Sequence, residues 1–140
     1  MNERTKKKLP RWLCEAAAEG RVGKLKKTLK LGADPNTRYK GATPLYLASV
    51  QGEVRCAELL LQAGASPNIE SQGWRSGLPL AAAAVHADLS MAELLLGYGA
   101  DPNQKETGGA TALDWARGWE EEVSAHAAVE TLLADAASEK

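Results

Sequence analysis

A five-residue string that recurs three times constrains the fold of this chain more than any other feature. It reads GADPN from Gly32, GASPN from Gly64 and GADPN from Gly99, so the copies are 32 and then 35 residues apart. Glycine, proline and asparagine in one short string indicate a turn, because each of them favours a non-helical backbone. The recurrence predicts tandem copies of one structural unit, since repeat architectures have periods of this length.

A second string recurs with nearly the same period as the first and indicates where a helix begins in each unit. Its copies read ATPLYLAS, GLPLAAAA and ATALDWA, and their anchoring leucines are Leu45, Leu80 and Leu113, spaced 35 and 33 residues apart. In the first copy, Thr43 can cap a helix while Pro44 occupies the first helical position, where its missing N–H costs nothing. Each unit is therefore predicted to open with a short helix.

A second helix is predicted after a glycine break such as Gly52. Apolar residues recur there at helical spacing: Val54, Ala57, Leu60 and Leu61 in one copy, and Leu89, Ala92, Leu95 and Leu96 in the next. The glycine of the GADPN string then ends that helix in a left-handed turn. One such helix pair has too small a core to be stable alone, so the pattern predicts that the units stack.

With these motifs, TPLxxA and GADxN, the sequence resembles ankyrin-repeat proteins over roughly residues 11–136. The resemblance implies an all-α solenoid of helix–turn–helix units with hairpin-like loops. We expect four repeats at about 11–36, 37–68, 69–103 and 104–137, of which the first and last are caps, after a disordered basic tail over residues 1–10. The loop asparagines Asn36, Asn68 and Asn103 are expected to hydrogen-bond across the turn.

Three departures from the repeat pattern are expected to alter local structure. Leu78 replaces the capping threonine of the third repeat, which leaves the helix start less well fixed. The same repeat carries about three extra residues at 72–76. The fourth repeat holds about four extra residues within 117–128, which predict a lengthened helix or an irregular turn.

The chain lacks the sequence motifs of common catalytic and nucleotide-binding sites, such as GxxxxGK[ST], GxGxxG, HExxH, CxxC and GxSxG. His86 and His126 are interpreted as surface residues, and Cys14 and Cys56 as small hydrophobic residues on helix faces in a reducing cytoplasm. No apolar run approaches the roughly 20 residues of a membrane span. We therefore expect no enzymatic activity, no cofactor, no metal and no membrane association.

Charge is distributed unevenly along the chain. Residues 1–40 hold twelve Lys/Arg and four Asp/Glu, a net charge of +8, whereas residues 41–140 hold five and fourteen, a net charge of −9. Four lysines, Lys24, Lys26, Lys27 and Lys30, fall on the expected solvent side of a helix. The basic end could bind an acidic surface or nucleic acid, or it could meet the acidic body of another copy head to tail. Nucleic acid is disfavoured because few aromatic residues lie nearby.

The resemblance also implies a binding surface, because ankyrin repeats usually bind partners along the concave side formed by the loops and first helices. Counting from the repeat strings places ten residues there: Tyr39, Lys40, Tyr46, Val50, Gln51, Trp74, Arg75, Val85, His86 and Trp119. Tyr46 could bind a partner or support the hairpin-like loop, and Trp115 is expected in the core. The sequence thus predicts a monomeric, non-catalytic module that binds a protein partner.

Overall fold

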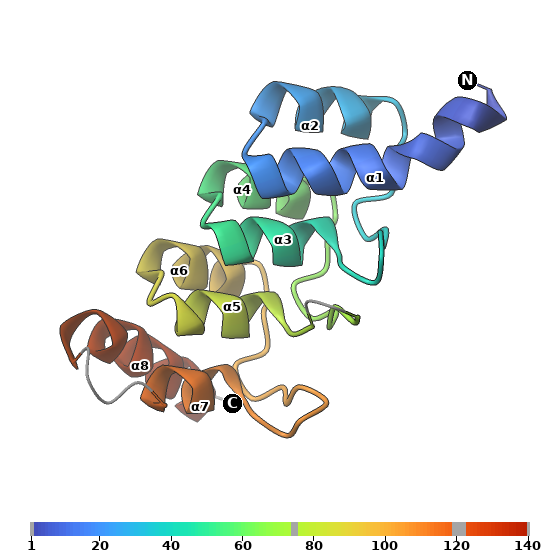
Figure 1. Ribbon diagram of the computed structural model, residues 1–140. Helices are drawn as coiled ribbons and strands as arrows, with labels where there is room; N and C mark the ends of the chain where they lie inside the picture. Colours follow the sequence, from blue (N-terminus) through green and yellow to red (C-terminus); the bar gives the residue numbers. More distant parts are fainter. Residues whose placement is uncertain (1, 74–75, 119–122, 140) are drawn as a thin grey trace.

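The computed structural model describes residues 2–73, 76–118 and 123–139, and the secondary structure of this part is helical. The helices are α1 (Glu3–Glu19), α2 (Val22–Lys30), α3 (Pro44–Gln51), α4 (Val54–Gln62), α5 (Pro79–Val85), α6 (Leu89–Gly97), α7 (Ala112–Arg117) and α8 (Val123–Ser138). Consecutive helices form pairs, and the pairs are stacked in chain order (Figure 1). The predicted all-α helix–turn–helix architecture is confirmed.

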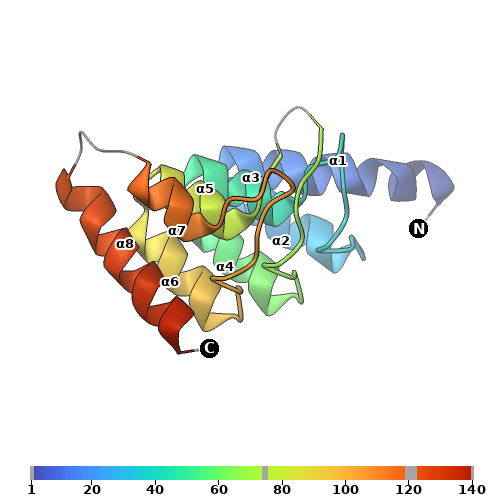
Figure 2. The ribbon, with the colours of Figure 1, turned by 90° about the horizontal axis from the view of Figure 1, so that it is seen from below.

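The stack has two rows of helices. Helices α1, α3, α5 and α7 pack one on the next, and α2, α4, α6 and α8 form the second row (Figure 2). Alanines fill the first row: Ala16, Ala48 and Ala83 are fully buried. Leucines and Met91 fill the second row, where Leu60 and Leu95 are also fully buried. Small residues in one row let its helices approach closely, because only a methyl group separates their backbones.

The first helices begin where the repeat strings predict. The Thr43 hydroxyl accepts a hydrogen bond from the Tyr46 N–H at 3.2 Å, and Pro44 opens α3. Gly52 ends this helix with a φ of 71°, a left-handed conformation that glycine adopts without strain. Helix α5 still begins at Pro79, although Leu78 offers no side-chain cap. Packing between repeats therefore fixes this helix start without the missing cap.

The loop asparagines link neighbouring repeats, which differs in detail from the predicted bond across the turn. The Asn36 side-chain oxygen accepts from the Ser66 N–H at 2.7 Å, and its amide donates to the Gly64 carbonyl at 3.2 Å. Both partners lie in the turn of the following repeat, and Asn68 makes the same pair of bonds one repeat further on. The asparagines thus hold successive loops side by side.

The prediction of a disordered tail over residues 1–10 is wrong, because α1 begins at Glu3. The Asn2 side chain caps this helix by accepting from the Thr5 N–H at 2.8 Å. Leu9 is buried against the stack and anchors the extension, although Pro10 interrupts the hydrogen-bond ladder behind it. The first turns of α1 therefore project beyond the other helices with their basic side chains exposed (Figure 1).

Of the two alternatives expected for the fourth repeat, a lengthened helix or an irregular turn, the structure shows a lengthened helix. Helix α8 has 16 residues, whereas α2, α4 and α6 have 9 each. Val129 and Leu133 of α8 are fully buried and continue the second row. Residues 119–122 of the extra segment lie outside the described residues.

Candidate functional site

An open groove of about 450 Å³ lies where the loops meet the first row of helices. Its lining comes from α3, α5, α7 and the two loops that precede α5 and α7. The lining residues are Tyr46, Val50, Ser76, Gly77, Leu78, Ala81, Ala82, Val85, His86, Glu106 and Trp115. We refer to this depression as the concave groove.

Four of the ten predicted binding residues lie in the concave groove: Tyr46, Val50, Val85 and His86. Gln51 is exposed at the end of α3 and does not line the groove. Tyr39 and Lys40 lie in the loop before α3, where the Lys40 ammonium sits 5.5 Å from the centre of the Tyr39 ring. The remaining three, Trp74, Arg75 and Trp119, lie outside the described residues.

Tyr46 supports the hairpin-like loop, which is one of the two roles considered for it. Its hydroxyl donates to the Ser76 carbonyl at 3.1 Å, which braces the loop before α5. Only 9% of the residue is exposed, yet one edge of the ring contributes to the groove wall. Tyr46 therefore supports the hairpin-like loop and shapes the groove at the same time.

The prediction that Trp115 lies in the core is wrong, because 41% of this residue is exposed and it lines the groove. The inward positions of α7 are instead taken by Ala112 and Ala116, which are four residues apart and buried. Trp115 consequently lies on the face of α7 that borders the concave groove. The sequence contains a signal for this position. Trp115 lies four residues after Thr111, and Ala82 lies four residues after Leu78, the equivalent position of the third repeat. Ala82 also lines the groove.

The two histidines differ in their surroundings. His86 is exposed at the end of α5, as predicted. His126 is buried instead, because α8 packs beside α5 and brings the His126 Nε2 atom to 3.1 Å from the Val85 carbonyl oxygen. The surface interpretation of His126 is therefore wrong, and this ring belongs to the contact between the third and fourth repeats.

Both cysteines are buried and free, as expected of small hydrophobic residues. Burial raises the pKa of the Cys14 thiol to about 12 and also raises the pKa of Cys56. Within the described part of the chain, no His, Cys, Asp and Glu side chains form a group of three that could hold a metal ion. Among the same residues, no helix is both long and apolar enough to cross a membrane.

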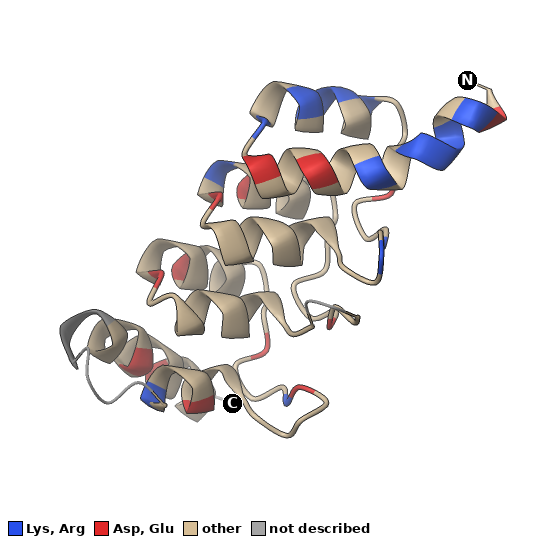
Figure 3. Cartoon of the chain, in the orientation of Figure 1, with Lys and Arg blue, Asp and Glu red and all other residues tan. Residues whose placement is uncertain are grey.

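A second hollow, of about 440 Å³, lies on the outer face of the first repeat. Trp12 of α1 and Leu31 provide apolar lining, Gly23 leaves open space, and Lys24 and Lys27 add two cationic side chains to the lining. We call this depression the end hollow. Lys and Arg gather on α2 and on the projecting part of α1, whereas Asp and Glu predominate in the later repeats (Figure 3).

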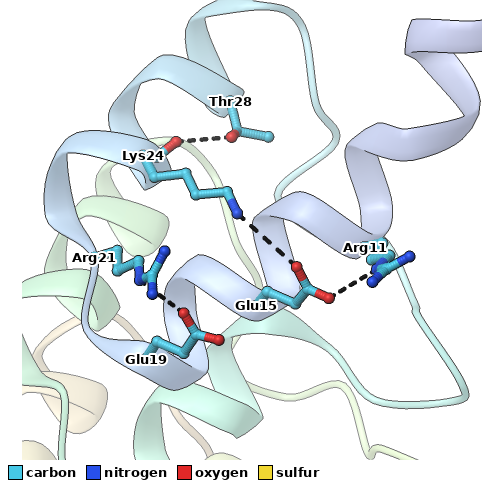
Figure 4. Close-up of polar contacts among 6 residues, drawn as sticks. All are labelled: Arg11, Glu15, Glu19, Arg21, Lys24 and Thr28. Atoms are coloured by element: carbon cyan, nitrogen blue, oxygen red, sulfur yellow. Dashed lines mark hydrogen bonds and ion pairs between the residues drawn. The ribbon is translucent and has the colours of Figure 1, made fainter.

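Ion pairs neutralise only part of the basic first repeat. Glu15 pairs with Arg11 at 2.7 Å and with Lys24 at 3.9 Å, and Glu19 pairs with Arg21 at 2.7 Å (Figure 4). Among the described residues, five exposed lysines of this repeat have no carboxylate within ion-pair distance: Lys7, Lys8, Lys26, Lys27 and Lys30. The positive charge of this end is therefore largely available to solvent.

Comparison with known proteins agrees with the tandem helix pairs. The model of three ankyrin repeats matches residues 13–106. This chain belongs to the ankyrin-repeat family. Ankyrin repeats are protein–protein interaction modules without catalytic function, so the family acts by binding partner proteins.

Three curated relatives each match about 40% of the chain. It is 45% identical over 58 residues to human cyclin-dependent kinase inhibitor 2A, covering 41% of this chain and 36% of that protein. It is 43% identical over 56 residues to human cyclin-dependent kinase 4 inhibitor B, covering 40% and 41%. A rice protein, potassium channel KOR1, is 42% identical over 55 residues, which cover 39% of this chain and 6% of the channel. The matches thus span less than half of each relative.

Proposed function

We propose that this ankyrin-repeat protein is a non-catalytic module that binds a partner protein in the concave groove. The observation that carries the proposal is a ready-formed groove in which Trp115 is 41% exposed beside Val50 and Val85. Large aromatic residues of this kind are enriched among the side chains that dominate binding energy at interfaces. Tyr39 and Lys40, one loop away, extend the proposed surface toward the first repeat.

The rigidity of the stack supports this proposal. Hydrogen bonds tie the loop before α5 to its neighbours, because Gln72 donates from its backbone to Gly41 at 2.9 Å and Arg38 donates to the Glu70 carbonyl at 3.0 Å. Glu70 in turn accepts from the Thr107 hydroxyl at 2.7 Å. A surface held in this way loses little conformational freedom on binding, which favours affinity.

Selection of peptides tests the proposed site. Random dodecapeptides displayed on phage are selected on the wild-type protein, and the recovered peptides are synthesised with a fluorophore for anisotropy titrations. Val85→Lys places a long cationic side chain on the groove wall, beside the Glu106 carboxylate, and is expected to weaken binding by about tenfold or more. Leu89→Lys is the matched control, because Leu89 is 37% exposed at the start of α6 and does not line the groove.

Circular dichroism of both variants checks that the helices remain intact. Binding that survives Val85→Lys but is lost in Leu89→Lys would place the site elsewhere on the protein. Peptides that bind both variants as tightly as they bind the wild type would also exclude the groove as the binding site.

The end hollow supports a second candidate function, binding of an acidic partner to the first repeat. Lys24 and Lys27 line this hollow together with the apolar residues Trp12 and Leu31. Lys24→Glu with Lys27→Glu should abolish binding of a poly-glutamate probe, and binding by the wild type should fall steeply with salt. We propose that the protein is a monomer and does not associate head to tail. Sedimentation of the wild type at low and high salt tests this proposal.

We also propose a reducing compartment, the cytoplasm, for this protein. The support is chemical: Cys14 and Cys56 are both free thiols in the core. Exclusive recovery of a tagged protein from a secreted or periplasmic fraction would contradict this assignment.

A further inference from the structure

Glu106 is the one carboxylate that lines the concave groove among the described residues, and its loop holds it in place. Its backbone N–H donates to the Ala110 carbonyl at 2.9 Å, and its carbonyl accepts from the Gly109 N–H at 2.8 Å. Gly109 has a φ of 93°, which closes this turn in the left-handed region. The carboxylate therefore projects from an ordered hairpin-like turn.

The Glu106 carboxylate packs against the bare backbone of Gly77 from the preceding loop. A Cβ atom on Gly77 would lie 3.0 Å from Glu106 Oε2 and 3.4 Å from Tyr46 Cε2. Gly77 also has a φ of 143°, so a side chain there would be both crowded and strained. The absence of a side chain at this position is what lets the acid reach the groove beside the Tyr46 ring.

The negative charge in the groove is only partly compensated. Burial, and secondarily the charge of Glu70, raise the pKa of Glu106, whereas a hydrogen bond with Trp115 lowers it. The described lining residues include no Lys or Arg, and no described cation lies within ion-pair distance of Glu106. A partner that covers the groove with apolar groups alone would desolvate this carboxylate further, which is unfavourable.

We propose that the concave groove accepts a cationic side chain, Lys or Arg, from its partner, which contacts both the Glu106 carboxylate and the exposed face of the Trp115 indole. The carboxylate supplies a charge-assisted hydrogen bond, and an exposed indole is the best aromatic surface for a cation. Val50 and Val85 provide apolar contact for the methylene stem of such a side chain. This inference rests on the proposed function and names the chemistry that the partner must supply.

The test uses a library of acetylated octapeptides in which one position at a time is fixed as each amino acid. Mixtures with Arg or Lys fixed at one position should bind wild type better than the corresponding citrulline or norleucine mixtures. Glu106→Gln should weaken the Arg or Lys mixtures by about tenfold, to the level of the neutral analogues. Glu93→Gln, an exposed acid on α6 outside the groove, is the matched control and should bind as wild type does.

A pH titration supplies a second readout for the same site. Because Glu106 must be ionised to attract a cation, Arg-peptide binding should weaken as the pH falls through its raised pKa. Binding by Glu106→Gln should lack this decrease. A flat wild-type profile would show that another contact selects the peptide and would overturn the inference.

The remaining outcomes separate the inference from the proposed function. Suppose that Val85→Lys abolishes peptide binding, but the peptides show no preference for Arg or Lys or no loss with Glu106→Gln. That outcome overturns the cation inference and leaves groove binding intact. Absence of any Val85-dependent binding overturns both.

Discussion

The outer face of the first repeat and the interfaces between repeats use the same helix positions with different residues. Lys24 of α2 corresponds to Cys56 of α4 and Met91 of α6, at the spacings of 32 and 35 residues set by the repeat strings. Cys56 and Met91 are fully buried, and the Cys56 thiol lies 3.9 Å from the Ala16 carbonyl of the preceding repeat. The Lys24 side chain is 37% exposed instead.

The next helical turn repeats this contrast. Thr28 corresponds to Leu60 and Leu95, which are fully buried between neighbours. Thr28 is 3% exposed, lines the end hollow and donates its hydroxyl to the Lys24 carbonyl at 2.7 Å (Figure 4). The difference shows how a repeat becomes a cap: positions that are apolar between two neighbouring repeats carry polar residues at the end of the stack.

The largest effect that tests this contrast should come from Leu60→Ala. Removing a fully buried leucine leaves a cavity between α4 and its neighbours, so the free energy of unfolding should fall by about 2–5 kcal/mol. Thr28→Ala, at the equivalent end position, should cost about 1 kcal/mol or less. Urea unfolding followed by circular dichroism measures both, and equal losses would mean that the cap is packed like an interior repeat.

The loop asparagines extend the comparison to the other end of the stack. Asn68 joins two repeats through bonds of 2.8 Å and 3.1 Å, so Asn68→Ala should destabilise by about 1–2 kcal/mol. Asn103, in the last repeat, reaches only the Ala137 carbonyl at 3.5 Å. Asn103→Ala should therefore cost about 0.5 kcal/mol or less in the same urea assay. If Asn103→Ala lowered the free energy of unfolding more than Asn68→Ala did, the terminal loop would contribute more to stability than the interior loop.

Cys14 sharpens the contrast within the first repeat, because it lies on the inner face of α1. Its thiol is 3.8 Å from the Ala42 carbonyl, and burial raises its pKa from 9.0 to about 12. The folded state therefore binds the proton more tightly than the unfolded state does. Stability should fall as the pH rises from about 9 toward 12, with a loss of roughly 1 kcal/mol by pH 10.

Comparison with Cys14→Ala isolates this contribution from lysine and tyrosine titration. The variant is expected to be less stable at pH 7 but to lose less stability between pH 8 and pH 10. Parallel pH profiles for the two proteins would indicate that the thiol is ionised as readily in the folded state as in the unfolded one.

Repetition explains how much of this molecule could be predicted from its sequence. Each string occurs in several copies, so the helix starts, the glycine breaks and the buried leucines support one another. Each terminal repeat carries only one of the two strings, so fewer copies support the prediction of its helices. The prediction that Trp115 lies in the core considers its short helix alone, although two small residues, Ala112 and Ala116, fill the inward positions.

Contacts between distant segments also escape the repeat pattern. His126 is buried because α8 packs beside α5, and no local signal in α8 reveals that neighbour. At the helical N-terminus, Leu9 is buried in the core that other repeats also form. Glu106 likewise becomes part of the groove only because Gly77, in another loop, leaves room for its carboxylate. The repeat pattern places the candidate site, whereas contacts between loops give it its charge.

The smallest expected effect concerns the end hollow itself. Gly23 lies in the first turn of α2, and a Cβ there would meet no atom within 4 Å. Gly23→Ala should raise the free energy of unfolding by about 0.5 kcal/mol, because alanine restricts the unfolded chain and fits the helix. A loss of stability on urea unfolding would mean that another group already occupies this space. The end face would then be a packed surface, and its contrast with the interior repeats would disappear.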